Sequence, residues 1–297
     1  SEGHGQAAYH AVVEADRSFA VIEGGIREAS FVRCDWMGVD RLGDMVVWDD
    51  VGGGGANDPM EYGQSTFDPM SGIFRIDPLG GEGDSAYGIP ADNPFVSSSD
   101  FAPETWAYGL RHPQAFSFDI DGTMYICDIG QTQIEEVNIG VAGANYGWRV
   151  REGTFATAFG LGGVRPNPVY PRPEDDQEYT YPVAQFDHDE GNAISSGFVY
   201  RGSAVPELQE KFVFTDMVTG RVFYIDTDNL EPDNPATILE LRIEFFGFER
   251  NVADALGFPN TYSRGNRAGL RLGIDSEGEL YFLTKGDGKI RKMVPAS

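Results

Sequence analysis

The sequence predicts an all-β repeat fold, and a β-propeller fits it best. Two kinds of short strand recur along the 297 residues, one in hairpins closed by Asp/Gly turns and one preceded by a glycine. The hydrophobic pattern indicates no long amphipathic helix. Short strands that repeat in this way are typical of small sheets packed one against the next. A β-sandwich is the alternative fold.

The clearest hairpin covers residues 115–127. Its first strand alternates small or polar residues with aromatic ones, and a second strand follows the turn. Gly122 supplies the positive φ that a tight reversal needs, and Asp119 or Asp121 can hydrogen-bond to the turn backbone. We therefore interpret Asp119 as a turn residue rather than a ligand.

Both strand types return elsewhere in the chain. Residues 272–282 match the first hairpin in their hydrophobic, acidic, glycine and tyrosine positions. A third, weaker copy is predicted at 47–52, where the strand after the turn is missing and three glycines follow. The glycine-preceded strand is predicted at 71–77, 219–226 and 287–292.

The length is compatible with one large all-β domain, which we expect to cover residues 1–297. No segment reads as a linker between two domains. Residues 80–99 and 166–180 are rich in Pro, Gly, Asp and Ser, as is typical of long loops on a rigid scaffold.

The charge balance is strongly acidic, with 47 acidic and 22 basic residues and a net charge of −25. This excess disfavours nucleic acids and anionic membrane surfaces as partners, because both would be repelled. Lysine is scarce among the basic residues. The composition favours an extracellular or periplasmic, calcium-bearing setting, with ordinary solubility charge as the alternative.

The two cysteines, Cys34 and Cys127, leave two interpretations open. Cys127 is a buried small hydrophobic residue, or the two form a disulfide in an oxidising compartment. No run approaches the roughly 18 apolar residues of a membrane span. No signal peptide opens the sequence, so we expect a soluble chain from which any export signal has been removed.

The densest motifs lie between residues 104 and 153. In order they are GLRHPQ at 109–114, FSFD at 116–119, DIGQ at 128–131, EEVN at 135–138 and GANYGW at 143–148. This ordered series resembles the glucose/sorbosone dehydrogenase family of soluble quinoprotein sugar dehydrogenases. The resemblance is good over residues 44–294 and weak over residues 1–43.

The resemblance implies a six-bladed propeller that holds pyrroloquinoline quinone (PQQ) and calcium over its axis and oxidises the C1 hydroxyl of aldose sugars. Family members carry further sequence ahead of this region, so we expect the N-terminal blades to be abbreviated or missing. Three explanations are open: the chain is a fragment, the propeller is smaller, or an oligomer partner completes it. Arg111 matches the arginine that contacts cofactor and substrate, and pairing with a nearby carboxylate is its alternative role. His112 stands where the family usually has asparagine, so it is expected either to donate to the cofactor at the catalytic site or to be a packing substitution.

The resemblance also assigns further binding residues. Gly130 and Gln131 match the step whose backbone carbonyls bind the cofactor's calcium, and Gln131 also borders the cofactor. Glu136 and the carbonyl of Tyr146 form a candidate second calcium site, with a surface acidic pair at 135–136 as the alternative. Two more cations are predicted to face the cofactor's carboxylates, Arg267 and Arg271.

Two departures from the family weaken the catalytic interpretation. The proton-accepting histidine is missing from residues 39–45, where Asp40 is the substitute base, and a cofactor-contacting lysine is missing from residues 215–220. The alternative hypothesis is therefore a non-catalytic extracellular propeller that binds a glycan or serves an assembly. His10 and His188 are the histidines that would restore the base, and a hydrolase or lyase is a third, more distant interpretation.

Overall fold

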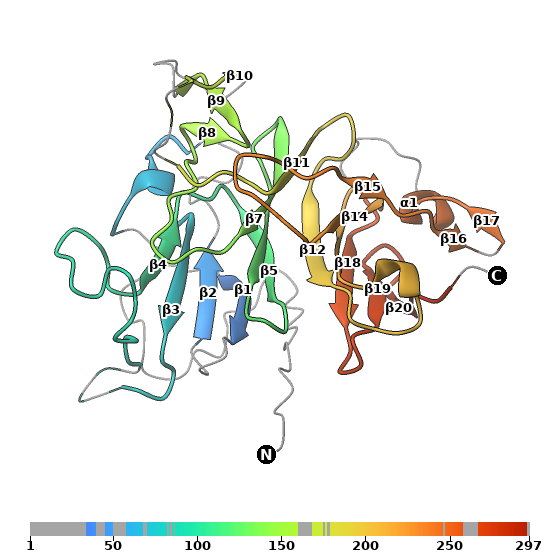
Figure 1. The fold of residues 1–297 in the computed structure, drawn as a ribbon, viewed down its shortest axis with the longest axis horizontal. Helices are drawn as coiled ribbons and strands as arrows, with labels where there is room; N and C mark the ends of the chain where they lie inside the picture. Colours follow the sequence, from blue (N-terminus) through green and yellow to red (C-terminus); the bar gives the residue numbers. More distant parts are fainter. Residues whose placement is uncertain are drawn as a thin grey trace.

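The structure is a computed structural model, and strands dominate it (Figure 1). It describes residues 34–39, 45–49, 58–67, 70–81, 83, 85, 87–159, 168–174, 176, 179–245, 247–257 and 267–295. Helical structure in this part is limited to α1 (Val252–Ala255) and to short 3-10 turns that include Tyr62–Gln64 and Pro206–Leu208.

Four antiparallel sheets form the body of the described chain, and each is written here in its spatial order. The first sheet is β1 (Cys34–Val39), β2 (Met45–Asp49), β3 (Gly72–Ile76) and β4 (Thr105–Tyr108). The second is β5 (Pro113–Phe118), β6 (Met124–Asp128), β7 (Ile134–Ile139) and β11 (Ala184–Asp187). The third is β12 (Ile194–Val199), β13 (Lys211–Asp216), β14 (Val222–Asp226) and β15 (Leu239–Glu240), and the fourth is β18 (Leu270–Ile274), β19 (Leu280–Thr284) and β20 (Lys289–Lys292).

Two smaller sheets are excursions from this body. One is formed by β8 (Arg151–Glu152), β9 (Phe155–Thr157) and β10 (Val169–Pro171), and the other by β16 (Glu244–Phe245) and β17 (Phe248–Glu249). Figure 1 shows the first excursion above the second sheet and the other beside α1 at the edge of the molecule.

The sheets pack as the blades of a propeller do. Their first strands meet in chain order, β1 beside β5, β5 beside β12 and β12 beside β18. Hydrophobic clusters fill the space between successive sheets; Tyr125 of β6, for example, stacks on Phe212 of β13 with ring centroids 4.5 Å apart. Each sheet therefore buries its faces against its neighbours, which confirms the predicted repeat architecture.

Both predicted strand types occupy equivalent places in different sheets. The hairpins at 115–127 and 272–282 are the first two strands of their sheets, and their turns contain Gly122 at φ 93° and Gly278 at φ 81°. The glycine-preceded strands are β3, β14 and β20, each the third strand of its sheet. A left-handed φ favours glycine because it has no Cβ to clash.

The predicted third copy of the hairpin at 47–52 was placed wrongly. Its first three residues end β2, the second strand of its sheet, and residues 50–52 lie outside the described part. Asp49 pairs with Cys34 just as Asp128 pairs with Pro113. The Asp-rich segment therefore corresponds to the end of β6 and not to the turn after β5.

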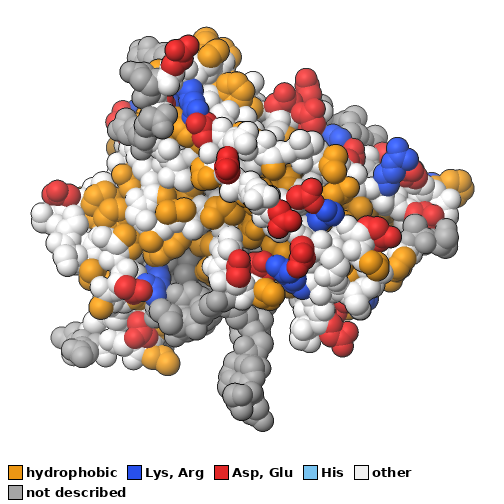
Figure 2. Space-filling model, viewed as in Figure 1, with side chains coloured by type: hydrophobic (Ala, Val, Ile, Leu, Met, Phe, Trp, Pro, Cys, Tyr) orange, Lys and Arg blue, Asp and Glu red, His pale blue; other side chains and the backbone are white. Residues whose placement is uncertain are grey.

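Cys127 is a free thiol that is 1% exposed, and its burial raises the pKa of the thiol. The structure therefore supports the interpretation of Cys127 as a small core residue over the disulfide. Within the described residues, no helix is long and apolar enough to cross a membrane. Acidic side chains are dispersed over the face in Figure 2, with fewer Lys and Arg among them.

Candidate functional site

Several of the predicted site residues, Arg111, Gln131 and Arg271 among them, lie at one end of the sheets. Pro113, Ile194 and Leu270, near the start of the first strand of each sheet, pair with the last residue of the second strand. The segments that precede β5, β12 and β18 therefore lie at the same end, here named the Arg111 face. The opposite end, where the first strands reach their turns, is named the Asp119 face.

Arg111 lies directly before β5 and contacts Gln131. Its Nε and Nη2 each donate to Gln131 Oε1 at 3.3 Å, and Nη1 donates to the carbonyl of Ile129 at 3.5 Å. Among the described residues Arg111 forms no ion pair with a carboxylate. Its guanidinium charge is thus held by neutral oxygens, although the chain has more than two acidic residues for each basic one.

Two aspartates fix the start of the first strands in the same way. The carboxylate of Asp128 accepts from the backbone N–H of Arg111 at 2.9 Å and of His112 at 2.6 Å. The carboxylate of Asp216 accepts from the backbone N–H groups of residues 192 and 193, both at 2.6 Å. His112 itself places Nε2 3.1 Å from Gln114 Oε1, so its ring faces its own strand.

Glu152 organises the loop that contains Gln131, a role that the sequence did not reveal. Its Oε1 accepts from four successive backbone N–H groups, those of residues 131–134, at 2.8–3.1 Å. Gly130 makes the tight loop feasible, because a Cβ there would lie 1.7 Å from the carbonyl oxygen of Ile134. The other oxygen, Oε2, is buried and has no partner among the described residues.

The acidic pair at 135–136 is not on the surface. Glu135 is fully buried and Glu136 is 8% exposed, so the surface-pair alternative was wrong. Glu136 accepts from the backbone N–H of Gly153 at 2.5 Å and from Asn138 Nδ2 at 3.0 Å. Burial and then the charge of Asp128 raise the pKa of Glu136 to about 8, and burial raises the pKa of Asp128 to about 7.

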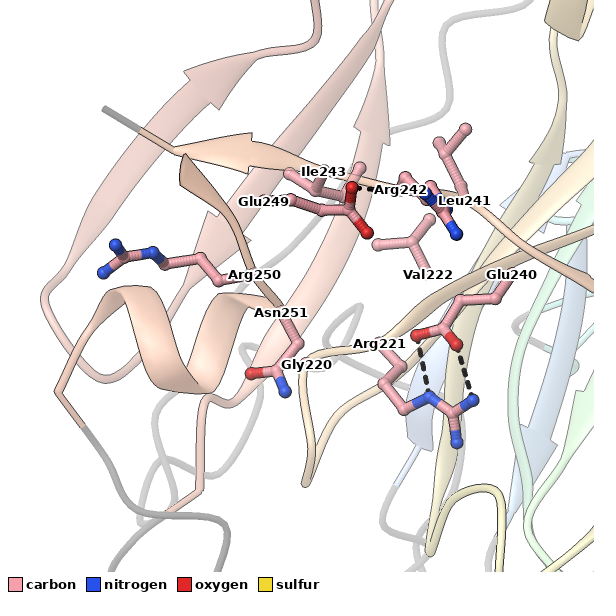
Figure 3. Close-up of a pocket in the computed structure, with 10 residues that line it drawn as sticks. All are labelled: Gly220, Arg221, Val222, Glu240, Leu241, Arg242, Ile243, Glu249, Arg250 and Asn251. Atoms are coloured by element: carbon pink, nitrogen blue, oxygen red, sulfur yellow. Dashed lines mark hydrogen bonds and ion pairs between the residues drawn. The ribbon is translucent and has the colours of Figure 1, made fainter. Parts of the chain in front are cut away.

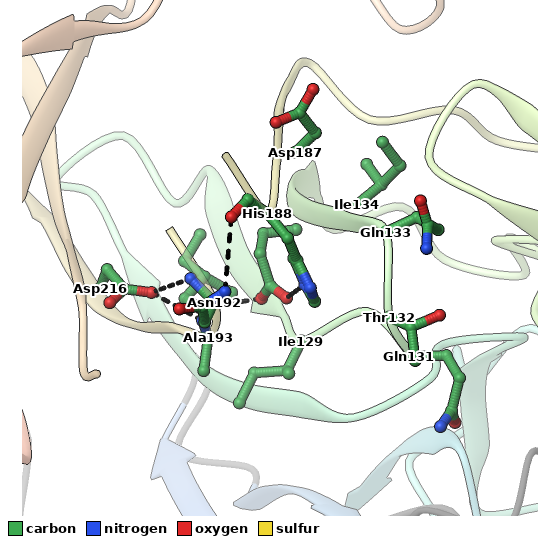
Figure 4. Close-up of polar contacts among 12 residues, drawn as sticks. Ile129, Gln131, Thr132, Gln133, Ile134, Asp187, His188, Asn192, Ala193 and Asp216 are labelled. Carbon is green, nitrogen blue, oxygen red and sulfur yellow. Dashed lines mark hydrogen bonds and ion pairs between the residues drawn. The ribbon is translucent and has the colours of Figure 1, made fainter. Parts of the chain in front are cut away.

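His188 follows β11 and pairs with Glu135. Its Nε2 lies 2.9 Å from Glu135 Oε1, and Glu135 Oε2 accepts from the backbone N–H of Ile194 at 2.8 Å. Burial alone would lower the pKa of His188, but the hydrogen bond and charge of Glu135 outweigh it and raise that pKa. Figure 4 shows the ring directed toward the loop of Gln131 and Thr132.

The two other predicted cations differ in their surroundings. Arg271, the second residue of β18, donates from Nη1 to Ser195 Oγ at 2.6 Å and lies 3.9 Å from Met217 Sδ. It therefore reaches from the fourth sheet to the start of β12. Arg267 is exposed just before β18.

The remaining predicted residues are placed as follows. Tyr146 is buried, and its hydroxyl donates to the carbonyl of Ile139 at 2.7 Å and accepts from the N–H of Val141 at 3.1 Å. Asp40 and His10 lie outside the described residues. The described strand ends that flank Asp40, Val39 and Met45, pair at the Asp119 face.

The chemistry around Glu136 fits a calcium ion. Asn138 Oδ1, like Glu152 Oε2, is a buried oxygen with no partner among the described residues. Calcium prefers oxygen ligands, and it would neutralise carboxylates that otherwise repel one another. In the described part no three His, Cys, Asp or Glu side chains form a ready metal-binding group, so neutral oxygens would complete the site.

A pocket of about 470 Å³ contains none of the predicted site residues (Figure 3). It lies between β14, β15 and the excursion that leads to α1. Arg221 and Glu240 form two parallel hydrogen bonds across it at 2.8 and 2.6 Å, and Arg242 lies 3.4 Å from Glu249. Because these charges already pair with one another, we assign the pocket no functional role.

Comparison with known proteins identifies a sequence family and a fold. The profile of the "Glucose / Sorbosone dehydrogenase" family matches residues 54–243. The HIPL1 protein of Arabidopsis thaliana is 30% identical over 268 residues, which is 82% of this chain and 36% of that protein. The aldose sugar dehydrogenase YliI of Escherichia coli (strain K12) is 38% identical over 61 residues, 20% of this chain and 16% of that protein.

Among solved structures, a glucose dehydrogenase aligns with a TM-score of 0.61 at 22% identity, over 88% of this chain and 63% of that one. The PQQ-bound aldose sugar dehydrogenase of Streptomyces coelicolor aligns with a TM-score of 0.55 at 17% identity, over 86% of this chain and 60% of that one. These matches confirm the predicted propeller fold, of which the described residues form four blades. The chain spans about a third of the length of the HIPL proteins it matches.

Proposed function

Because the chain belongs to the glucose/sorbosone dehydrogenase family, we propose that it is an oxidoreductase that oxidises the C1 hydroxyl of aldose sugars with PQQ and calcium, outside the cytoplasm. One observation carries the proposal. Arg111, His188 and Arg271 come from segments far apart in the sequence, yet all three lie on the Arg111 face.

The cations of this face fit an anionic quinone. PQQ carries carboxylates and quinone oxygens, which a planar guanidinium can bind through two parallel hydrogen bonds. Arg111 is available for this role, because its described partners are neutral oxygens. Arg271, held by Ser195, would supply a second positive charge from the neighbouring sheet. When bound, PQQ supplies the electrophilic acceptor for the hydride of the sugar.

His188 is the residue that we assign as proton acceptor, in place of Asp40. Its hydrogen bond to Glu135 favours the tautomer that carries the proton on Nε2, which leaves Nδ1 free to accept one. Glu135 would then stabilise the imidazolium that forms, as a carboxylate does in other catalytic histidine pairs. His112 is less suited, because its ring nitrogen already contacts Gln114.

Calcium would bind at two places. The carbonyls of Gly130 and Gln131 would hold the cofactor's ion. Glu152 already fixes this loop, because its carboxylate accepts hydrogen bonds from four successive backbone N–H groups. Glu136, with the carbonyl of Tyr146, would hold a second ion beside the unpartnered oxygens of Asn138 and Glu152. Both sets consist of oxygen ligands, as calcium requires.

A non-catalytic binding or assembly module is the second candidate function. Residues 215–220 favour it, because they carry no cation. In this segment, both carboxylate oxygens of Asp216 accept hydrogen bonds from backbone N–H groups. Such a segment serves to fix the sheet rather than to bind an anionic cofactor.

Reconstitution separates the two functions. The purified chain would be titrated with PQQ by isothermal calorimetry, with and without calcium, and then assayed for aldose oxidation with a dye acceptor. We expect calcium-dependent binding, turnover with aldoses, and a loss of turnover with retained PQQ binding in His188→Gln. PQQ binding without turnover in the unaltered chain favours the binding module, and absence of both excludes the dehydrogenase.

A further inference from the structure

Two consecutive serines of β12 join the third sheet to the fourth. Ser195 and Ser196 are 0% and 1% exposed, and β12 lies beside β18, the first strand of the next sheet. Ser195 Oγ donates to the carbonyl of Leu270 at 2.8 Å. Ser196 Oγ accepts from the backbone N–H of Leu272 at 2.6 Å and donates to its carbonyl at 3.4 Å. Both hydroxyls therefore link the two inner strands through the backbone of β18.

Only one of the two serines also contacts a cation of the Arg111 face. Arg271 Nη1 donates to Ser195 Oγ at 2.6 Å, whereas the hydrogen bonds of the Ser196 hydroxyl go to the backbone of Leu272. A serine hydroxyl has one proton and two lone pairs. Because Ser195 gives its proton to the carbonyl of Leu270, its lone pairs are directed toward the guanidinium. The position of Arg271 is thus set by a side chain of the neighbouring sheet.

Met217 lies on the other side of the same guanidinium nitrogen. Its backbone N–H donates to the carbonyl of Ala193 at 2.9 Å, and its own carbonyl accepts from the N–H of Gly269 at 2.9 Å. These bonds hold the loop after β13 between the starts of β12 and β18. Met217 Sδ lies 3.9 Å from Arg271 Nη1. Nη1 therefore contacts a hydroxyl and a thioether, and neither of these two partners carries a charge.

We propose that Ser195 is a positioning residue that holds Arg271 in the orientation in which it binds the carboxylates of PQQ. The inference rests on the proposed function, because it takes Arg271 as a cofactor-binding cation. An arginine side chain has many rotamers, and fixing it before the ligand arrives reduces the entropy that binding costs. Ser195 is fully buried, so it acts through Arg271 and not by contact with the cofactor.

A matched pair of variants tests the proposal on the whole chain. Ser195→Ala and Ser196→Ala each remove one buried hydroxyl from the same junction, so both should lower the urea midpoint of unfolding to a similar extent. Calorimetry with PQQ and calcium should show binding about 5-fold weaker in Ser195→Ala, and less than about 2-fold weaker in Ser196→Ala. Equal losses of PQQ affinity in the two variants would mean that Ser195 only stabilises the junction, and would overturn the proposal.

A second measurement needs no cofactor. Phenylglyoxal modifies accessible guanidinium groups, and mass spectrometry of the folded chain would follow the partly exposed Arg271, with Arg111 as the internal reference. Loss of the hydrogen bond in Ser195→Ala should speed the modification of Arg271 about 3-fold, whereas Ser196→Ala should leave it unchanged.

The two measurements separate this proposal from the proposed function. Absence of PQQ binding in the unaltered chain would overturn both. Tight PQQ binding in the unaltered chain, with unchanged affinity and unchanged modification of Arg271 in Ser195→Ala, would overturn the assignment of Ser195 alone.

Discussion

The pKa values of buried carboxylates are shifted in opposite directions on the Arg111 face and on the Asp119 face. On the Arg111 face, burial and mutual repulsion raise the pKa of Asp128 to about 7 and of Glu136 to about 8. On the Asp119 face, hydrogen bonds lower the pKa of Glu279, the largest from the hydroxyl of Tyr200. The carboxylate of Glu279 is therefore held by hydrogen bonds, whereas the described part of the Arg111 face retains crowded acids beside an arginine that has no carboxylate partner there.

This difference in pKa distinguishes acidic residues that stabilise the fold from acidic residues that could serve a functional site. Raised pKa values caused by burial and like charges are typical of functional sites, although structural networks also produce them. Here the crowding coincides with the residues that resemble a cofactor site, and the opposite end shows that the same fold can pair its acids. Five experiments test this difference between the two faces.

The largest expected effect on stability is at Asp216. Asp216→Ala removes the acceptor of the backbone N–H groups of residues 192, 193, 218 and 219, and the last three of these hydrogen bonds are buried. Leaving buried donors unpaired should lower the free energy of unfolding by about 3–5 kcal/mol. Urea unfolding measures this. The exposed Asp233→Ala is the control, with a loss below about 1 kcal/mol, and equal losses in the two variants would contradict the prediction.

Calcium should act on the Arg111 face alone. If the ion binds at Glu136, calcium at 100 times its dissociation constant should stabilise the fold by about 2.7 kcal/mol. The variant Glu136→Gln should lose most of this gain, whereas Glu279→Gln on the other face should keep it. Thermal unfolding with calcium and with a chelator measures the difference. A gain that is the same in Glu136→Gln as in the unaltered chain would rule out the ion at this position.

The bridge between Arg201 and Asp119 tests the other face. Arg201→Ala leaves the carboxylate of Asp119 buried without its partner, and we expect a loss of about 2 kcal/mol, reduced by the partial exposure of Arg201. Lys211→Ala, which breaks an exposed ion pair with Asp226, is the control. Chemical unfolding of both variants measures these losses. Equal losses in the free energy of unfolding would show that Arg201 and Asp119 do not form a structural bridge.

Acid stability should depend on the Asp119 face. The pKa of Glu279 is lowered below its ordinary value of 4.5, so its contribution is fully present above that pH and is lost as the pH falls through the lowered value. The Glu279→Gln variant should therefore be less stable than the unaltered chain at pH 7. The difference between their free energies of unfolding should become smaller as the pH falls below 4.5. Unfolding monitored from pH 7 to pH 3 would detect this, and a difference independent of pH would contradict it.

The smallest effect on stability is expected at Arg111. Since its side chain holds only neutral acceptors, Arg111→Lys should change the free energy of unfolding by no more than about 0.5 kcal/mol. The same variant should lose much of any PQQ affinity, because an ammonium cannot reproduce the guanidinium fork. Unfolding and calorimetry on one preparation test both statements, and a large loss of stability would make Arg111 a structural residue.

Local patterns in the sequence predicted the parts of the fold that depend on short-range geometry. The turn at Gly122 and its copy at Gly278 follow from the positive φ that each reversal requires. The prediction at residues 47–52 failed because Asp and Gly also occur where a second strand ends, so composition alone did not distinguish the two positions.

The site was predictable only where one continuous motif carried it. Arg111 and Gln131 belong to the same ordered series, and the structure brings them into contact. Glu152 contacts the loop at 131–134 from the two-residue strand β8, which has no periodic signal, and His188 contacts Glu135 from the turn after β11. Such contacts depend on how distant strands pair, which a single sequence does not encode in its spacing.

The hydrogen bond from Ile194 to Glu135 has a consequence for how this architecture changes during evolution. The third strand of one blade supplies the acceptor, and the first strand of the next blade supplies the donor. Loss of the downstream blade would therefore leave the buried carboxylate of Glu135 without this donor, although every strand of its own blade was intact. We expect these two blades to be retained together during evolution, because neither satisfies its own buried polar groups at this junction.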